Sequence, residues 1–317
     1  MQNSLKNYSN FYGITLKIYK QPNQLTNKKM VKITNIKKLE ELANRLRIEI
    51  IRMITEAGSG HPAGSLGITD VMTALYFNAM KHNPKNPKWK NRDRLILSNG
   101  HVCPARYAAM AYAGYFPKKE LLNLRKLGSK LQGHPSYTDL PALESSSGPL
   151  GLNLSVAVGQ ALALRMDKNP ARVFCITSDG DHDEGNTWEA IMFAGNYKLN
   201  NLINIVDRNH IQLSGKTEKI MPLEPFKQKY LAFKWNVIEI NGNKISEIIR
   251  ACEKAKKMKN KPTVIIANIV PGKGVSFMEG KSEWHGKALI KEEAKQALEE
   301  LKSSRRDANQ SRGIKRK

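Results

Sequence analysis

The sequence predicts an α/β fold, in which a mostly parallel, twisted sheet carries helices on both faces. Apolar runs at residues 173–176 and 202–206 are typical of buried parallel strands. Between them, apolar residues recur at helical spacing, which predicts a crossover helix. Strand and helix patterns alternate from about residue 94 to residue 270 without a linker, so we expect one domain over residues 31–301.

The first helix is predicted over residues 36–57, because five apolar residues form one stripe at intervals of three and four. It should end at Gly58-Ser59-Gly60, since glycine commonly terminates a helix. The stripe consists of Leu39, Leu42, Leu46, Ile50 and Ile54. The elements expected next are a helix over 69–80, a loop over 83–91, a strand over 94–97, helices over 104–115 and 118–127, and an irregular segment over 128–148.

A turn framed by glycines, Gly148-Pro149-Leu150-Gly151, opens the next helical pattern. A proline near the first turn of a helix, framed by glycines, leaves backbone N–H groups free at a positively polarised helix end. Such an end can cradle a diphosphate. An ordinary junction between a loop and a helix would have the same composition, so the motif alone leaves both interpretations open.

The two apolar runs end in polar loops, Ser178-Asp179-Gly180 and Asp207-Arg208-Asn209-His210-Ile211. Asp179 and Asn209 are 30 residues apart, about the length of one strand-helix-strand unit whose parallel strands end on the same sheet edge. The two side chains should therefore meet. Mg²⁺ prefers such oxygen donors and takes further ligands from substrate phosphates. Taken alone, the loops are also compatible with ordinary Asp-Gly turns.

The remaining pattern predicts a further strand, helix and strand, and then a last helix. These are a strand over 237–240, a turn at Asn241-Gly242, a helix over 244–257, a strand over 264–270 and a helix over 291–301. Residues 1–30 are polar and rich in Lys, and we expect a disordered extension there. Residues 302–317 are expected to form a disordered basic tail.

The net charge of +24 in 317 residues first suggests a nucleic-acid partner. More than half of this charge lies at the two ends, since residues 1–39 hold eight Lys and no acid, and residues 302–317 hold seven Lys or Arg against one Asp. The body lacks the alternation of Arg and aromatic residues that single-strand binders use. Nucleic-acid binding therefore stays a minor alternative.

Cysteine use and hydropathy bear on the compartment. Cys103, Cys175 and Cys252 form no Cys-x-x-Cys pair and are interpreted as buried, reduced residues. No apolar run approaches the roughly 18 residues of a membrane span, and the N-terminus lacks the apolar stretch of a secretory signal. We expect a cytoplasmic protein with no membrane partner.

Four of the seven histidines adjoin a glycine. A histidine in such a loop can donate to phosphate and hydroxyl oxygens and exchange protons near neutral pH, so a cluster of them suits a phosphorylated, polyhydroxylated substrate. Their spacing is not that of zinc ligands. The four are His61, His101, His134 and His285, whereas His82, His182 and His210 have no such setting.

With these residues laid out, the chain resembles transketolase, and specifically its N-terminal, thiamine-diphosphate-binding portion encoded as a separate subunit. The similarity runs from about Leu42 to Leu301, and the ordered series of motifs is more specific than any one of them. The motifs are Ser59-Gly60-His61-Pro62, Asn91-Arg92-Asp93-Arg94, Ser98-Asn99-Gly100-His101, Gly133-His134-Pro135, Gly148-Pro149-Leu150-Gly151, Asp179-Gly180, Glu184-Gly185, Asp207-x-Asn209 and Trp284-His285-Gly286-Lys287.

The resemblance implies a thiamine-diphosphate-binding fold whose cofactor is held through Mg²⁺, or through Ca²⁺ or Mn²⁺ in its place. The implied metal ligands are Asp179, the Asn209 side chain and the Ile211 carbonyl. The implied cofactor contacts are His101, Gly148, Pro149, Leu150, Gly180, Asn209, Ile211 and His285. The implied catalytic residues facing the sugar are His61, His134 and His285, with His61 and His285 as proton-transfer partners. Glu184 would lie where two protomers meet.

The implied reaction transfers a two-carbon ketol unit from a ketose phosphate to an aldose phosphate, as in the pentose phosphate pathway. In the family, a pyrimidine-binding domain supplies the glutamate that activates the cofactor, and that domain would follow Leu301. We therefore expect the partner to be a separate C-terminal transketolase subunit, together with a heterotetramer and little activity of the chain alone.

Beside nucleic-acid binding, two alternatives stay open. One is a related enzyme that uses the same cofactor, such as 1-deoxyxylulose-5-phosphate synthase or a transketolase-like enzyme of a specialised sugar pathway. The other is a non-catalytic subunit that binds the cofactor or serves assembly. The second draws support from departures from the family pattern: Ser178 for Gly, Asn153 for Gly with Leu152 for Gln, Asp181 and His182 for Glu-Leu, and Pro271 for a Lys that Lys273 could replace.

Overall fold

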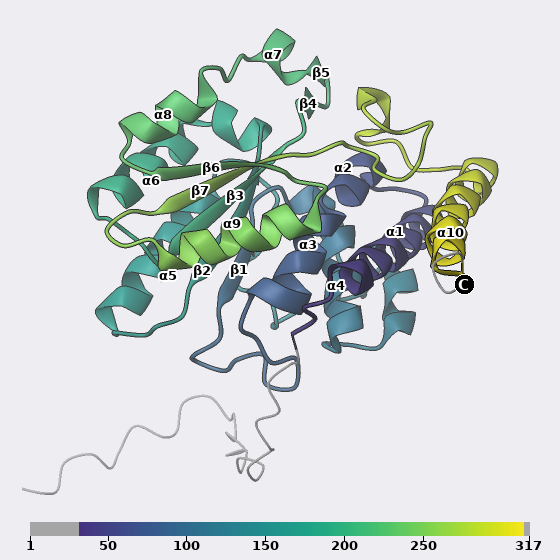
Figure 1. Ribbon diagram of the computed structural model, residues 1–317, viewed down its shortest axis with the longest axis horizontal. Helices are drawn as coiled ribbons and strands as arrows, with labels where there is room; N and C mark the ends of the chain where they lie inside the picture. Colours follow the sequence, from purple (N-terminus) through teal and green to yellow (C-terminus); the bar gives the residue numbers. More distant parts are fainter. Residues whose placement is uncertain (1–31, 314–317) are drawn as a thin grey trace, which may run out of the picture.

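The computed structural model describes residues 32–313, with side chains described through residue 303. Five parallel strands form one sheet in the order β1-β2-β3-β7-β6 (Figure 1). They are β1 Arg94–Leu97, β2 Val173–Ser178, β3 Leu202–Arg208, β6 Asn236–Asn241 and β7 Thr263–Asn268. All five predicted strands are present, and the predicted α/β class is confirmed.

Successive residues of each strand face two separate cores, because side chains alternate across a sheet. Phe174 and Ile176 of β2 belong to the larger core, and Val173 and Cys175 belong to the smaller core. Helices therefore cover both faces, as predicted (Figure 1). The larger core contains residues of α1 Ile36–Ala57, α3 Thr69–Ala74, α4 Cys103–Ala113 and α9 Ile245–Lys257; the smaller contains residues of α5 Asn153–Met166, α6 Gly185–Asn196 and α8 Phe226–Ala232.

The first and last described helices, α1 and α10 Lys291–Gly313, lie side by side (Figure 1). The Asn44 side chain of α1 donates a hydrogen bond to the Leu301 carbonyl at 2.8 Å. We predicted an end near residue 301, but the helix continues to Gly313, so the backbone is helical where an unstructured tail was expected. Residues 314–317 and the predicted extension over residues 1–30 lie outside the described residues.

The N-terminal helices are more divided than predicted. The helix expected over residues 69–80 consists of α3 and a π-helical turn, η1 Leu75–Ala79. It is preceded by an unpredicted short helix, α2 Pro62–Gly67, with proline in its first turn. Proline is favoured there because the first N–H groups of a helix have no partner within it.

The prediction of a helix over residues 118–127 is wrong. The structure has a 3₁₀-helix, η3 Lys118–Asn123, and Leu124 already leaves helical geometry. Arg125 has a φ of 61°, and its N–H donates to the Leu131 carbonyl at 2.9 Å instead of continuing the helix. A hydrogen bond with the following loop thus replaces the next helical turn. Residues 128–148 contain no helix or strand, as predicted.

A small substructure after β3 was not predicted, because each of its elements is too short for a periodic pattern. It consists of the hairpin β4 Ile211–Gln212 and β5 Gly215–Lys216, followed by α7 Thr217–Ile220. Three further 3₁₀ turns lie in loops: η2 Gly100–Val102, η4 Gly180–Asp183 and η5 Ser282–Trp284.

The three cysteines are buried and unpaired, which agrees with the interpretation from sequence. Within residues 32–313, no helix combines the length and the apolar character that spanning a bilayer requires.

Candidate active site

The predicted site residues gather at the carboxyl ends of neighbouring strands. Ser178 of β2 pairs in register with Asp207 of β3, so the loops that follow start at the same level of the sheet. The loop after β1, which contains His101, begins beside them: the Ser98 N–H donates to the Ile176 carbonyl at 2.7 Å. Open parallel sheets bind their ligands at this edge.

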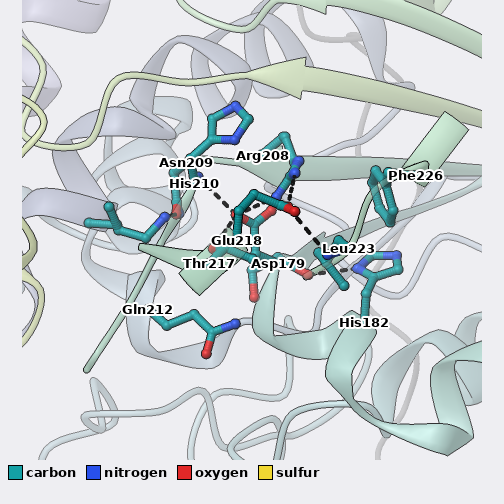
Figure 2. Close-up of polar contacts among 12 residues, drawn as sticks. Asp179, His182, Arg208, Asn209, His210, Gln212, Thr217, Glu218, Leu223 and Phe226 are labelled. Atoms are coloured by element: carbon teal, nitrogen blue, oxygen red, sulfur yellow. Dashed lines mark hydrogen bonds and ion pairs between the residues drawn. The ribbon is translucent and has the colours of Figure 1, made fainter. Parts of the chain in front are cut away.

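The Asp179 side chain makes all its described polar contacts through one carboxylate oxygen. Oδ2 accepts the His210 N–H at 2.8 Å and the Thr217 hydroxyl at 2.9 Å, and it forms an ion pair with Arg208 Nη1 at 3.0 Å (Figure 2). Oδ1 is buried and has no hydrogen-bond partner. Burial raises the pKa of Asp179, and the charge of Arg208 opposes that rise. The carboxylate is therefore fixed, with one oxygen left available to a ligand.

Asn209 lies next to this carboxylate, because the following residue, His210, donates its N–H to Asp179. His210 has a φ of 61°, which turns the chain sharply. Asn209 Oδ1 accepts the Ile211 N–H at 3.1 Å. The two loops predicted to share a metal are thus in direct contact. The ligand roles of Asp179, Asn209 and Ile211 stay predictions.

Arg208 was missed by sequence reasoning. The Arg208 side chain is only 2% exposed. Its guanidinium also contacts Glu218 Oε1 at 2.7 Å (Figure 2) and Glu224 Oε1 at 2.9 Å. Glu218 belongs to α7 and Glu224 to the loop before α8, neither of which was predicted. Arg208 therefore ties the segment after β3 to the carboxylate of Asp179.

Asp207 is a second buried carboxyl at this edge that was not given a role from sequence. Its Oδ2 accepts the Asn99 amide at 3.2 Å, while its Oδ1 and Asn99 Oδ1 have no partner. Burial raises the pKa of Asp207 to about 8, and the neighbouring charge of Asp179 adds to that rise. Asp207 is therefore protonated more readily than an ordinary carboxyl group.

The turn Gly148-Pro149-Leu150-Gly151 lies beside the Asp179 loop, because a Cβ on Gly180 would be 3.0 Å from Leu150 Cδ1. A Cβ on Gly148 would meet nothing within 4 Å, so its backbone borders open space. We expected the turn to form the start of the helix, but α5 begins at Asn153. Gly151 has a φ of 80°, which favours glycine and ends the turn before the helix starts.

The four histidines next to glycines come together, although they lie in four distant parts of the chain. The His61 ring centroid is 5.0 Å from that of His101, 6.3 Å from that of His134 and 5.6 Å from that of His285. The centroids of His101 and His285 are 5.1 Å apart. The cluster predicted from the composition of the loops is therefore present as one group.

Burial and crowding keep these rings neutral. Burial lowers the pKa of His61 to about 4, with further lowering from His285, Arg125 and His134. Burial also lowers the pKa of His101, His134 and His285. His61 Nδ1 is buried without a hydrogen-bond partner. Neutral imidazoles can both donate and accept hydrogen bonds, so the cluster can bind hydroxyl groups and exchange protons with them.

The other histidines have structural partners. His82 contacts the Tyr115 hydroxyl at 2.9 Å and the Tyr76 carbonyl at 2.6 Å. His210, to which the sequence assigns no role, lies at the candidate site, where its backbone N–H donates to the Asp179 carboxylate.

Comparison with known proteins agrees with this geometry. Residues 38–307 match the family model described as "Transketolase, thiamine diphosphate binding domain". The chain belongs to the transketolase family. The recognition from sequence motifs and the thiamine-diphosphate-binding fold are both confirmed.

Two similar proteins are transketolase subunits of about the same length as this chain. The 6-deoxy-6-sulfo-D-fructose transketolase subunit SqwG of Clostridium sp. (strain MSTE9) is 44% identical over 263 residues, covering 83% of this chain and 96% of that subunit. A subunit of the apulose-4-phosphate transketolase of Phocaeicola vulgatus is 37% identical over 266 residues, covering 84% of this chain and 94% of that subunit.

Among solved structures, the transketolase of Campylobacter jejuni superposes with a TM-score of 0.79 at 38% identity. The match covers 84% of this chain and 43% of that one, so this chain spans less than half of that transketolase.

One of the departures from the transketolase pattern, Pro271 in place of lysine, has a clear structural setting. Pro271 lies against α2, where a Cβ on Gly67 would be 3.3 Å from Pro271 Cα. Lys273, the possible replacement for the missing lysine, pairs with Glu279 Oε1 at 3.1 Å. Its ammonium is therefore already engaged by a carboxylate.

Glu184, predicted to lie between transketolase protomers, is exposed at the start of α6. A Cβ on Gly151 would be 2.4 Å from Glu184 Cβ, so this residue borders the turn predicted to hold the diphosphate. Its role at an interface stays a prediction.

Proposed function

We propose that this chain is the N-terminal subunit of a two-subunit transketolase, which binds thiamine diphosphate through Mg²⁺ and transfers a two-carbon ketol unit from a ketose phosphate to an aldose phosphate. The observation that carries the proposal is the convergence, on one sheet edge, of the Asp179 and Asn209 loops in a chain of this family. The partner would be a separate C-terminal subunit with the pyrimidine-binding domain.

The donor set fits a hard divalent cation. Asp179 Oδ1 is a buried carboxylate oxygen without a partner, and Asn209 Oδ1 accepts only one N–H among the described contacts. Within residues 32–313 there is no group of three or more His, Cys, Asp or Glu side chains that could hold a metal. One carboxylate, one amide and the Ile211 carbonyl instead suit Mg²⁺, which takes further oxygens from phosphate and water.

The diphosphate would lie against the backbone of Gly148, Pro149, Leu150 and Gly180. Gly148 and Gly180 lack side chains, so a ligand can approach the chain closely there. The open space beside Gly148 supports this placement. His101 and His285 would contact the cofactor from the histidine cluster.

The sugar would be bound by His61, His134 and His285. His61 lies at the centre of the group, within 6.3 Å of each of the other three ring centroids. Because burial keeps His61 neutral, its imidazole can accept a proton from a substrate hydroxyl or return one. Thiamine diphosphate, when bound, supplies the carbanion-stabilising chemistry, and the protein supplies orientation and polarity.

A partner subunit is supported by the lengths of the relatives. SqwG and the Phocaeicola vulgatus protein align with this chain over 96% and 94% of their own lengths and are named as subunits, whereas the Campylobacter transketolase is more than twice as long as its matched part. The exposed apolar side chains of Val156 in α5 and of Met192 and Phe193 in α6 support an interface. We propose a cytoplasmic heterotetramer with two copies of each subunit.

The direct test is reconstitution. The chain and its C-terminal partner are mixed with thiamine diphosphate, Mg²⁺, xylulose 5-phosphate and ribose 5-phosphate, and ketol transfer is measured. We expect activity from the mixture and little or none from either protein by itself. Full activity of the chain alone would refute the need for a partner.

Specialised donors such as 6-deoxy-6-sulfofructose belong in the same assay, because the relatives are named for different sugars. Activity with such a donor and none with xylulose 5-phosphate would assign the enzyme to a specialised sugar pathway instead of the pentose phosphate pathway. Cofactor binding without transfer from any donor would favour a non-catalytic subunit.

A further inference from the structure

One buried carboxylate contacts three of the segments that we propose bind the cofactor. Asp181 lies in η4, just after Asp179, and is fully buried. Its Oδ1 accepts the Ser98 hydroxyl at 2.5 Å and the Gly151 N–H at 2.9 Å. Its Oδ2 accepts the Ser178 N–H at 2.7 Å and the Ser178 hydroxyl at 2.9 Å.

These donors come from separate parts of the chain. Ser98 begins the loop after β1 that contains His101, and Gly151 ends the turn predicted to cradle the diphosphate. Ser178 ends β2, directly before Asp179. Ser98 lies 83 residues from Asp181 in sequence, and Gly151 lies 30 residues away. Asp181 is the described side chain that joins all three segments.

Asp181 and Asp179 differ in how many hydrogen-bond acceptor positions on their carboxylate oxygens remain free. A carboxylate provides about four acceptor positions, and four donors already contact Asp181. Asp179, by contrast, keeps a buried oxygen without a partner. The first carboxylate is therefore suited to hold the loops together, and the second to hold a ligand.

We propose that Asp181 is a positioning residue that holds these three cofactor-binding segments in one fixed arrangement before thiamine diphosphate and Mg²⁺ bind. The inference rests on the proposed function. Groups behind the ligands orient them, and their loss commonly weakens binding although they touch no ligand themselves.

The departures from the transketolase pattern at positions 178 and 181 form a matched pair. Ser178, in place of glycine, supplies the hydroxyl for one of the four hydrogen bonds, and Asp181 is one methylene shorter than the usual glutamate. His182 completes the unit, since its Nδ1 donates to the Ser178 carbonyl at 2.7 Å. The N–H, hydroxyl and carbonyl of Ser178 are thus all bound within this loop.

The main test is Asp181→Asn in the complex with the partner subunit. Each Asp181 oxygen receives one backbone N–H, from Gly151 or Ser178, so the amide nitrogen of Asn must oppose one of them in either orientation. Titration calorimetry with thiamine diphosphate in Mg²⁺ buffer should show that the affinity is at least about 10-fold weaker than that of the wild-type complex. The apparent KM for the cofactor should rise, while kcat at saturating cofactor and the KM for both sugars stay unchanged.

Two further variants make the test specific. Asp183→Asn is the matched control, because Asp183 lies in the same turn, is exposed and contacts the Gln212 side chain. It should bind the cofactor like the wild type. Asp181→Glu should weaken binding because it adds a methylene to a filled site, and adding Ser178→Gly should restore affinity by removing the side chain beside it.

Wild-type affinity of Asp181→Asn in a complex with normal thermal stability would overturn the inference. Equal losses in sugar KM, kcat and stability would also overturn it, since they would indicate a general structural role. If Asp181→Asn does not fold, Ser98→Ala removes a single hydrogen bond and should give an intermediate loss of cofactor affinity; no loss would count against the inference. If the wild-type complex binds no thiamine diphosphate, the proposed function itself fails.

Discussion

The contacts of Asp179 make the effect of an isosteric change predictable. Three donors, from His210, Thr217 and Arg208, face one carboxylate oxygen, so the amide oxygen of Asp179→Asn should take that side. The amide NH₂ then lies where Oδ1 would meet a cation, and it cannot act as a metal ligand. We expect Mg²⁺-dependent binding of thiamine diphosphate to be abolished in the assembled complex, as measured by calorimetry.

Thermal unfolding of the same variant is the control, because the change keeps the size of the side chain. A variant with near-normal stability and unchanged Mg²⁺-dependent binding would remove Asp179 from the proposed metal site.

His182 should make stability depend on pH. Burial lowers its pKa from the ordinary 6.5 to about 4, the charges of Arg208 and Lys229 add to this, and the hydrogen bond to Ser178 opposes it. Between pH 4 and pH 6.5, the His182 ring is therefore protonated in the unfolded chain and neutral in the folded chain. Stability contributed by the neutral ring is therefore lost as pH falls below 6.5, by about 2 kcal/mol between pH 7 and pH 5.

Urea unfolding of wild type and His182→Gln at both pH values measures this contribution. The variant should lose about 2 kcal/mol less than the wild type on acidification, because glutamine does not titrate. The other histidines titrate in both proteins and cancel in the difference. Equal losses would show that folding leaves the pKa of His182 near its ordinary value, and would contradict the burial of a neutral ring.

The individual site residues differ in how far the sequence predicts them. Adjacency to glycine was enough to select the four histidines, and strand ends were enough to select Asp179 and Asn209. Arg208 and Asp181 were not selected, because their importance depends on partners far away or in unpredicted elements. Ser98, for example, lies 83 residues from Asp181. No local pattern contains such a contact.

A substitution at Gly195 tests how closely α6 packs against the rest of the chain. A Cβ on Gly195 would lie 1.9 Å from the Phe233 carbonyl oxygen, which is backbone and cannot rotate away. Overpacking of this kind costs about 1–3 kcal/mol, so Gly195→Ala should lower the free energy of unfolding by at least that order in urea titration of the chain. The helix must move from the segment before β6 to accept a methyl group.

Gly159→Ala in α5 is the matched control. It is also a helical glycine, but a Cβ there meets nothing within 4 Å. Alanine should stabilise the chain by about 0.5–1 kcal/mol, because glycine is the poorer helix former. Equal effects of the two changes would contradict the close contact between α6 and Phe233.

The secondary structure was predictable where one physical cause dominates. β2 and β3 are buried along their whole length, so their apolar runs identify them, and the stripe of α1 is equally clear. The prediction failed at residues 118–127, where the Arg125 N–H bonds to Leu131, and at the start of α5, where Gly151 takes a positive φ. Both depend on local hydrogen bonds and turns that hydrophobic spacing does not record.

At the scale of the whole molecule, two neighbouring helices, α5 and α6, expose apolar side chains to solvent. Val156 of α5 is 40% exposed, and Met192 and Phe193 of α6 are 55% and 37% exposed. Between the two helices lies a groove of about 290 Å³ that Val158, Gly159 and Phe193 help to line. Exposed apolar patches of this kind mark sites of association. We propose that another subunit of the heterotetramer covers this surface.

A charge placed on this surface should weaken assembly. Met192→Asp puts a carboxylate into a contact that we propose is apolar, and burying an unpaired charge is strongly unfavourable. Sedimentation velocity of the reconstituted complex should show a species smaller than the tetramer. Leu127→Asp is the control, because Leu127 is also exposed but lies in the loop after η3. If both variants form the same complex as wild type, the α5 and α6 surface is not the interface, and subunits must meet elsewhere.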